Sequence, residues 1–137
     1  MGTIRNMTVP EISGIHHVTL TVSDAPTAAA WYRDVLGFEI AKQVQVNEIT
    51  RVMMTRAGFE LVLDSHGDKA LFDGFSERHL GLDHLSFAVA DRTVLDQWAE
   101  HLDEVGVKRS PVKQGSTGSL LAFRDPDNIA LEFYTLS

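Results

Sequence analysis

The strongest constraint on the fold is an internal repeat, in which two stretches of the chain share one order of residue types. Residues 17–24 have the sequence HVTLTVSD and residues 84–91 have the sequence HLSFAVAD, an offset of 67 positions (84 minus 17). Both run histidine, apolar, hydroxyl, apolar, small, valine, small, aspartate. A match of this kind indicates a duplicated supersecondary unit, which we expect to occur twice in the fold.

Each copy continues with the pattern of one helix and then three strands. An apolar stripe at helical spacing follows Asp24 and Asp91 and stops at Gly37 or Gly106. Aspartate is a favoured N-cap, and glycine adopts the left-handed conformation that ends a helix. Alternating apolar residues then predict strands at 38–46, 49–56 and 58–65, and at 107–113, 119–124 and 129–135.

The predicted fold class is therefore α+β, with two tandem βαβββ modules. We expect an N-terminal tail at 1–13, a first module at 14–65, a linker at 66–80 and a second module at 81–137. The two modules would form one domain over 14–137, because a chain of 137 residues is long enough for two half-domains that share a core.

Composition excludes several classes of partner and site. Twelve Lys and Arg against nineteen Asp and Glu give a net charge of −7, without a basic run that could neutralise nucleic acid or an anionic membrane. The absence of cysteine removes disulfides and thiolate metal ligands. No apolar run is long enough for a membrane span or a signal-peptide core, so a cytoplasmic location is expected.

Strand alternation places four metal-ligand side chains on the faces that point away from the core. His17 and His84 each fall on the polar face of the first strand of their copy, and Glu60 and Glu132 fall on the polar face of the closing strands. Aligning Phe-Glu-Leu at 59–61 with Leu-Glu-Phe at 131–133 makes the two glutamates equivalent. Each half then offers one histidine and one glutamate.

If the apolar faces pack on the helices, the opposite faces of two curved sheets meet across a cleft that contains all four side chains. We therefore predict one divalent cation held by His17, Glu60, His84 and Glu132. Imidazole and carboxylate without thiolate suit Zn, Ni, Co, Mn or Fe(II). A lone histidine or glutamate on an exposed sheet face is usually only solvated, and it is the repetition that favours a site.

The chain resembles the vicinal oxygen chelate superfamily, which includes glyoxalase I, fosfomycin-resistance proteins, methylmalonyl-CoA epimerase, extradiol dioxygenases and bleomycin-binding proteins. The resemblance spans residues 15–134. It is carried by IHHVTLTVSD at 15–24, WYRDVLGF at 31–38, GLDHLSF at 81–87 and FRDPDNIALEF at 123–133.

The resemblance implies paired βαβββ modules that form an open cup around a central metal cleft, with ligands at His17, His84 and Glu132. Glu60 matches the fourth ligand position, which glyoxalase I fills with glutamate. It also implies a small-molecule substrate with two vicinal oxygens, catalytic proton transfer by Glu60 or Glu132, and a homodimer. In some family members the two modules of one site come from different chains.

Three functions compete at this stage. The first is a glyoxalase-like lyase or isomerase, although the segment after Glu60 lacks the Asn-Trp-Gly of glyoxalase I, which disfavours a glutathione substrate. The second is an Fe(II) extradiol-type dioxygenase that uses His17, His84 and Glu132. The third is a bleomycin-resistance-type protein that binds its ligand without catalysis.

Overall fold

The computed structural model describes residues 8–137, so the first seven residues of the predicted tail lie outside the described part. The first half contains β1 (Val18–Thr21), α1 (Ala25–Leu36), β2 (Glu39–Val46), β3 (Ile49–Arg56) and β4 (Phe59–Ser65). The second half contains β5 (Leu85–Ala88), α2 (Arg92–Glu104), β6 (Lys113–Gln114), β7 (Ser119–Arg124) and β8 (Ala130–Thr135). Within residues 8–137, neither helix could cross a membrane.

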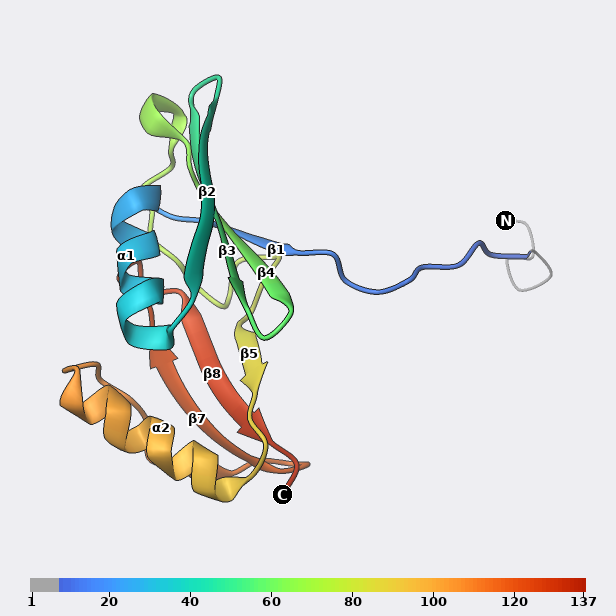
Figure 1. Ribbon diagram of the computed structural model, residues 1–137, viewed down its shortest axis with the longest axis vertical. Helices are drawn as coiled ribbons and strands as arrows, with labels where there is room; N and C mark the ends of the chain where they lie inside the picture. The colour runs from blue at the N-terminus through green and yellow to red at the C-terminus, as the bar shows by residue number, and fades with distance from the viewer. Residues whose placement is uncertain (1–7) are drawn as a thin grey trace.

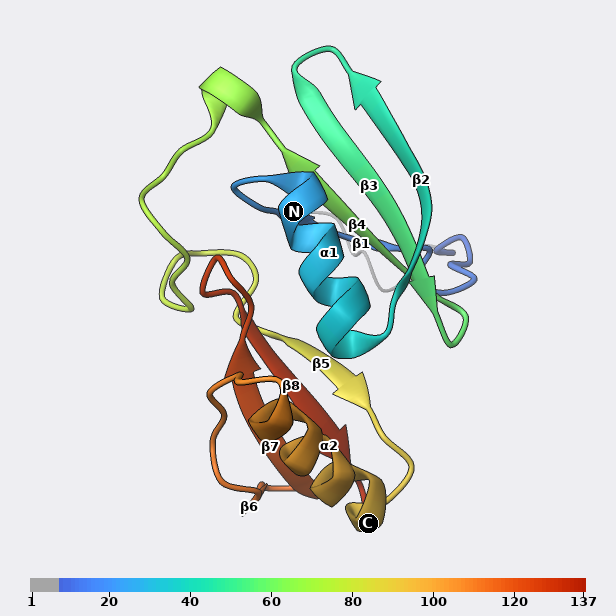
Figure 2. The same cartoon turned by 60° about the vertical axis from the view of Figure 1, so that its left-hand side comes forward.

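The two halves have the same sheet topology, as the repeat predicts. The strand orders are β1-β4-β3-β2 and β5-β8-β7-β6. In each sheet the first strand pairs in parallel with the closing strand, and the other neighbours pair antiparallel. Figures 1 and 2 show the sheets as separate open layers, each with its helix on one face. The predicted α+β fold of two βαβββ modules is confirmed.

Both helices begin at the aspartate that closes the repeat. Asp24 accepts a hydrogen bond from the Thr27 amide at 3.1 Å, and Asp91 accepts one from the Val94 amide at 3.0 Å. These bonds satisfy main-chain donors that the first helical turn leaves free. The first helix ends at Gly37, whose φ of 77° is the left-handed conformation predicted for that residue.

One hydrophobic core runs through both halves on the helix side of the sheets. The ring of Phe87 in β5 lies 5.8 Å from that of Phe38 and 6.3 Å from that of Phe59, both in the first half. Polar contacts also cross between the halves. The buried Tyr32 hydroxyl donates to Asp125 at 2.8 Å, and His101 donates from Nε2 to the Val35 carbonyl at 2.7 Å. The halves therefore have a defined mutual orientation.

The predicted strand at 107–113 is wrong for most of its length. Only Lys113–Gln114 forms a strand there, and a single bridge joins Arg109 to Phe123. Pro111 has no main-chain N–H to donate to a ladder, and the Arg109 guanidinium turns back to bond Asp103 and the Ala99 carbonyl of α2. Residues 107–112 therefore make only isolated main-chain contacts with β7, such as the Ser110 amide donating to the Ala122 carbonyl at 2.8 Å.

Candidate metal centre

The four predicted ligands lie just before the first strand, or within the closing strand, of each half. His17 and His84 come immediately before β1 and β5, while Glu60 lies in β4 and Glu132 in β8. The neighbouring residues Leu61 and Leu131 are buried in the core. Alternation therefore turns both glutamates toward the helix-free faces of the sheets, as predicted.

His84 and Glu132 form the one pair among these four that the structure brings into contact. His84 Nε2 lies 3.5 Å from Glu132 Oε1, and the side chains are 45% and 16% exposed. On the other side of the ring, His84 Nδ1 lies 2.8 Å from Asp83 Oδ1. Because a carboxylate only accepts, Nδ1 carries the proton. This carboxylate–histidine arrangement orients Nε2 for a cation, as outer partners of metal-bound histidines commonly do.

The surroundings of His84 are rich in carboxylates. The hydrogen bond to Asp83, with the charges of Glu132 and Glu77, raises the pKa of His84 above its ordinary value. Glu77 is itself held by Arg124 through two bonds of 2.8 and 2.7 Å, and this guanidinium lowers the pKa of Glu77 to about 2. A cation at Nε2 would take the place of the proton that these carboxylates favour.

His17 and Glu60 do not join this pair within one chain. His17 is exposed, and its Nδ1 lies 2.8 Å from Nδ1 of His16. Across residues 8–137, no three His, Asp or Glu side chains come close enough together to hold a metal ion. The convergence of all four predicted ligands is thus absent from the single chain.

The strand register separates Glu60 from the position of Glu132. Thr19 of β1 pairs with Val62 of β4, whereas Ser86 of β5 pairs with Glu132 of β8. Thr19 and Ser86 each follow the repeated histidine by two residues, so Val62 is the structural equivalent of Glu132. The predicted equivalence of the two glutamates is wrong.

The reason for this error is the period of a strand. Glu60 precedes Val62 by two residues and lies on the same face, so a slip of two positions leaves the apolar pattern unchanged. The hairpins also differ, since residues 57–58 join β3 to β4 whereas residues 125–129 join β7 to β8. Local similarity around each glutamate could not reveal this difference.

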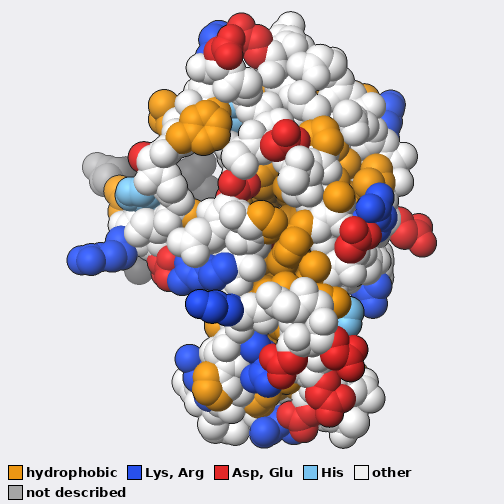
Figure 3. Space-filling model, turned by 90° about the vertical axis from the view of Figure 1, so that its left-hand side faces the viewer, with side chains coloured by type: hydrophobic (Ala, Val, Ile, Leu, Met, Phe, Trp, Pro, Cys, Tyr) orange, Lys and Arg blue, Asp and Glu red, His pale blue; other side chains and the backbone are white. Residues whose placement is uncertain are grey.

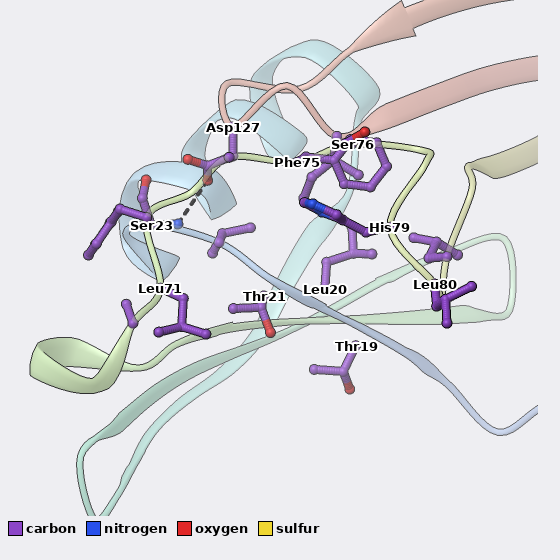
Figure 4. Close-up of a pocket in the computed structure, with 16 residues that line it drawn as sticks. Thr19, Leu20, Thr21, Ser23, Leu71, Phe75, Ser76, His79, Leu80 and Asp127 are labelled. Carbon is purple, nitrogen blue, oxygen red and sulfur yellow. Dashed lines mark hydrogen bonds between the residues drawn. The ribbon is translucent and has the colours of Figure 1, made fainter.

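Two hollows adjoin the helix-free faces. One, of about 540 Å³, is lined by Ser86, Ala88 and Tyr134 and lies along β5 and β8. The other, of about 440 Å³, lies between β1 and the connecting segment 66–83. Figure 4 shows Thr19 and Thr21 of β1 in the second hollow, with His79 from the connecting segment. Ser86, the strand partner of Glu132, lines the first hollow, which offers space for a small substrate.

Several site residues were not identified from the sequence. Asp83 carried a signal, because it directly precedes a repeated histidine. The pairing of Glu77 with Arg124 had none, since 47 positions separate them. Two further arginines, Arg51 and Arg56, are also held by partners within the chain. Asp64 accepts two hydrogen bonds from Arg51, of 2.8 and 2.9 Å, on a helix-free face, whereas Arg56 donates to the Gly37 carbonyl.

Comparison with known proteins identifies relatives over nearly the whole chain. Residues 14–133 match the family model described as the glyoxalase/bleomycin resistance protein/dioxygenase superfamily. A glyoxylase/bleomycin resistance protein/dioxygenase domain from Frankia sp. EAN1pec is 36% identical, with 91% of this chain and 98% of that chain covered and a TM-score of 0.84. Among curated proteins, no sequence matches this chain significantly.

More distant solved structures share the fold. A glyoxalase family protein from Enterococcus faecalis is 24% identical over 89% of this chain and 97% of that chain, with a TM-score of 0.76. A variant of the fosfomycin resistance protein FosX from Listeria monocytogenes, solved with Mn(II) and 1S,2S-dihydroxypropylphosphonic acid, is 21% identical over 90% of each chain, with a TM-score of 0.68.

Proposed function

Because the chain belongs to the glyoxalase/bleomycin resistance protein/dioxygenase superfamily, we propose that it is a divalent-metal-dependent, glyoxalase-like lyase or isomerase acting on a small substrate with two vicinal oxygens. The observation that carries this proposal is the contact of His84 Nε2 with Glu132 at 3.5 Å, with Asp83 behind the ring. Its donor atoms suit Zn, Ni, Co, Mn or Fe(II).

The third ligand in this proposal is His17 of a second copy of the chain. His17 occupies the same place before β1 that His84 occupies before β5. Within one chain, however, Glu132 contacts His84 and not His17. Both β1 and β5 are edge strands, so each leaves one main-chain edge free for an approaching copy. Two copies related by a twofold axis would form two identical sites.

A bound divalent cation would act as a Lewis acid on the substrate oxygens. Asp83 would keep the His84 ring oriented, and the hollow beside Ser86 and Tyr134 would receive the substrate. Glu60 would be the proton-transferring base, since it lies near His17 on the same sheet face but outside the position equivalent to Glu132. Positioned acid–base groups typically contribute about 10² to 10⁴ in rate.

The structure of the FosX variant supports the substrate class proposed here. The compound found there with Mn(II) carries hydroxyl groups on neighbouring carbons.

The second candidate function is a dioxygenase, and it is favoured by Val62 at the position equivalent to Glu132. Two histidines and one carboxylate with open coordination positions are the ligand set of Fe(II) oxygenases.

The test begins with metal content. The untagged protein is stripped, reloaded separately with Mn(II), Zn(II), Ni(II), Co(II) or Fe(II), and analysed for bound metal. His17→Ala, His84→Ala and Glu132→Gln are expected to lose the metal, while Glu60→Gln keeps it and loses solvent-deuterium exchange into α-hydroxyketones. His79→Ala, in the connecting segment, is the control. Wild-type protein that binds none of these metals would refute the proposal.

Mixed dimers then test the second copy. His17→Ala and Glu132→Ala proteins are unfolded together in equal amounts and refolded. A site shared between copies would be intact once in each mixed dimer, so about one site in four should regain metal. A site contained within one chain would regain none. Selective activity with Fe(II) and O₂ would favour the dioxygenase alternative.

A further inference from the structure

A cavity of about 480 Å³ lies between the two halves at β5, where residues 86–90 line it with side chains from both faces of the sheet. Its walls include the rings of Phe38, Phe59, Phe87, Trp98 and Phe133, and its one charged lining residue is Arg56. His84 and Glu132 do not line it. We propose that this inter-half cavity binds a small organic anion with an aromatic or short acyl body, at a place that does not include the proposed metal ligands.

The aromatic wall is held by contacts among its own rings. Phe87 packs against Phe38, Phe59 and Phe133 at centroid distances of 5.8, 6.3 and 5.9 Å. Trp98 of α2 stacks on Phe133 at 4.2 Å. Rings fixed in this way leave the cavity open without a ligand, and they offer faces and edges to a flat apolar group.

The lining of the cavity suits a ligand site. Ligand sites occupy roughly 300 to 1,000 Å³ and are mostly apolar with a few polar groups, and this cavity is lined by five aromatic rings and one charged side chain. Figure 3 shows hydrophobic side chains at the surface on the helix side, reaching the narrow waist between the halves. The molecule therefore exposes apolar surface where the cavity lies.

Arg56 determines the charge of the ligand that the cavity favours. Its Nη1 donates to the Gly37 carbonyl at 2.9 Å, which fixes the guanidinium beside the cavity. Arg56 forms no ion pair with any residue from 8 to 137. The remaining N–H groups can bind a carboxylate, sulfonate or phosphate.

Two dyes that differ by one charge test this proposal. 1-Anilinonaphthalene-8-sulfonate is an aromatic anion, and N-phenyl-1-naphthylamine lacks its sulfonate. Titrations use a Trp31→Phe protein, in which Trp98 is the remaining tryptophan and reports dye in the cavity by energy transfer. We expect one saturable site per chain for each dye. Arg56→Gln should weaken the sulfonate dye about tenfold and change the neutral dye less than about twofold.

Matched variants separate the cavity from other apolar surfaces. Val94→Phe, or the smaller change Val94→Leu if the first variant is less stable, fills the cavity and should weaken both dyes at least about tenfold. Arg33→Gln removes an arginine outside the cavity and should change neither. Unchanged binding in a folded filling variant would overturn the proposal. So would loss of binding in Phe72→Ser, which removes an exposed ring of the connecting segment.

Failure of dye binding in the cavity can be told apart from failure of the proposed metal-dependent function. His84→Ala, which lacks a metal ligand of the proposed site, should bind both dyes as wild type does. If a second copy covers the inter-half cavity, neither dye binds the assembled protein, and the proposal is refuted while metal binding remains intact.

Discussion

At the residue scale, the hydrogen bond of Tyr32 to Asp125 is the most buried polar contact between the halves. Tyr32 is 0% exposed and Asp125 is 5% exposed. Asp125 also accepts the amides of Asp127 and Ile129, each at 2.9 Å. One carboxylate thus shapes the turn before β8 and joins it to α1. Burial, with the adjacent carboxylate, raises the pKa of Tyr32 well above its ordinary value, so it remains a donor.

Removing the Tyr32 hydroxyl should therefore weaken the fold. We expect Tyr32→Phe to lower the free energy of unfolding by about 1.5–3 kcal/mol, the usual range for a hydrogen bond to a charged group. Urea unfolding followed by circular dichroism measures the change. The other tyrosine provides a control, because Tyr134 is less buried and bonds only the exposed Thr117. Equal losses in Tyr32→Phe and Tyr134→Phe would contradict this account.

Asp125 also predicts a pH dependence of stability. Burial raises the pKa of Asp125 above its ordinary value, against the opposing hydrogen bonds from Ile129 and Tyr32. Between the unfolded aspartate pKa, about 3.9, and the raised value, the folded chain binds more protons than the unfolded chain. Stability from this group therefore falls as the pH rises through that window.

The measurement is the difference in unfolding free energy between wild type and Asp125→Asn. In this difference the contributions of the other carboxyl groups cancel. As the pH rises from 4 upward, the unfolding free energy of wild type should fall relative to that of Asp125→Asn. The difference should become constant at about one pH unit above the raised pKa. A difference that does not change with pH would show that the folded and unfolded pKa values of Asp125 are equal.

At the element scale, the β6–β7 turn depends on close approach of main chains. Gly118 lies where a Cβ atom would overlap the main-chain oxygen of Thr135 in β8. At Gly115, the Cβ atom would meet the movable end of the Leu120 side chain. We expect Gly118→Ala to cost about 1–3 kcal/mol and Gly115→Ala clearly less, by thermal unfolding. The reverse order would contradict this account of the turn.

At the scale of the whole molecule, the proposed second copy links assembly to metal binding. A ligand that binds one state stabilises it by about 2.7 kcal/mol at 100 times its dissociation constant. Mn(II) should therefore shift the monomer–dimer equilibrium toward the dimer in sedimentation velocity. His17→Ala should not respond to Mn(II), although its metal-free equilibrium should match wild type. An equal Mn(II) response in this variant would contradict a shared site.

The connecting segment contributes exposed apolar surface to the molecule. Leu71, Phe72 and Leu80 are 88%, 75% and 104% exposed. All three line the hollow beside β1, and exposed apolar side chains that lie together commonly mark a contact surface. The connecting segment thereby offers an apolar surface to a second copy that brings its His17 to His84.

Much of the fold could be predicted from the sequence because local rules act on neighbouring residues. The repeat at His17 and His84, the caps at Asp24 and Asp91, and the faces of the strands each depend on residues a few positions apart. The same rules placed Glu132 on the helix-free face.

Only the tertiary structure decided which of these residues meet. The register of β1 with β4 puts Val62, and not Glu60, at the position of Glu132, because an alternation of period two cannot detect a slip of two residues. The contact of His84 with Glu132, and its carboxylate surroundings from Asp83 and Glu77, depend on pairing across distant segments. The repeat determined that each half carries a histidine before its first strand, and packing determined that one chain brings only His84 to a carboxylate ligand.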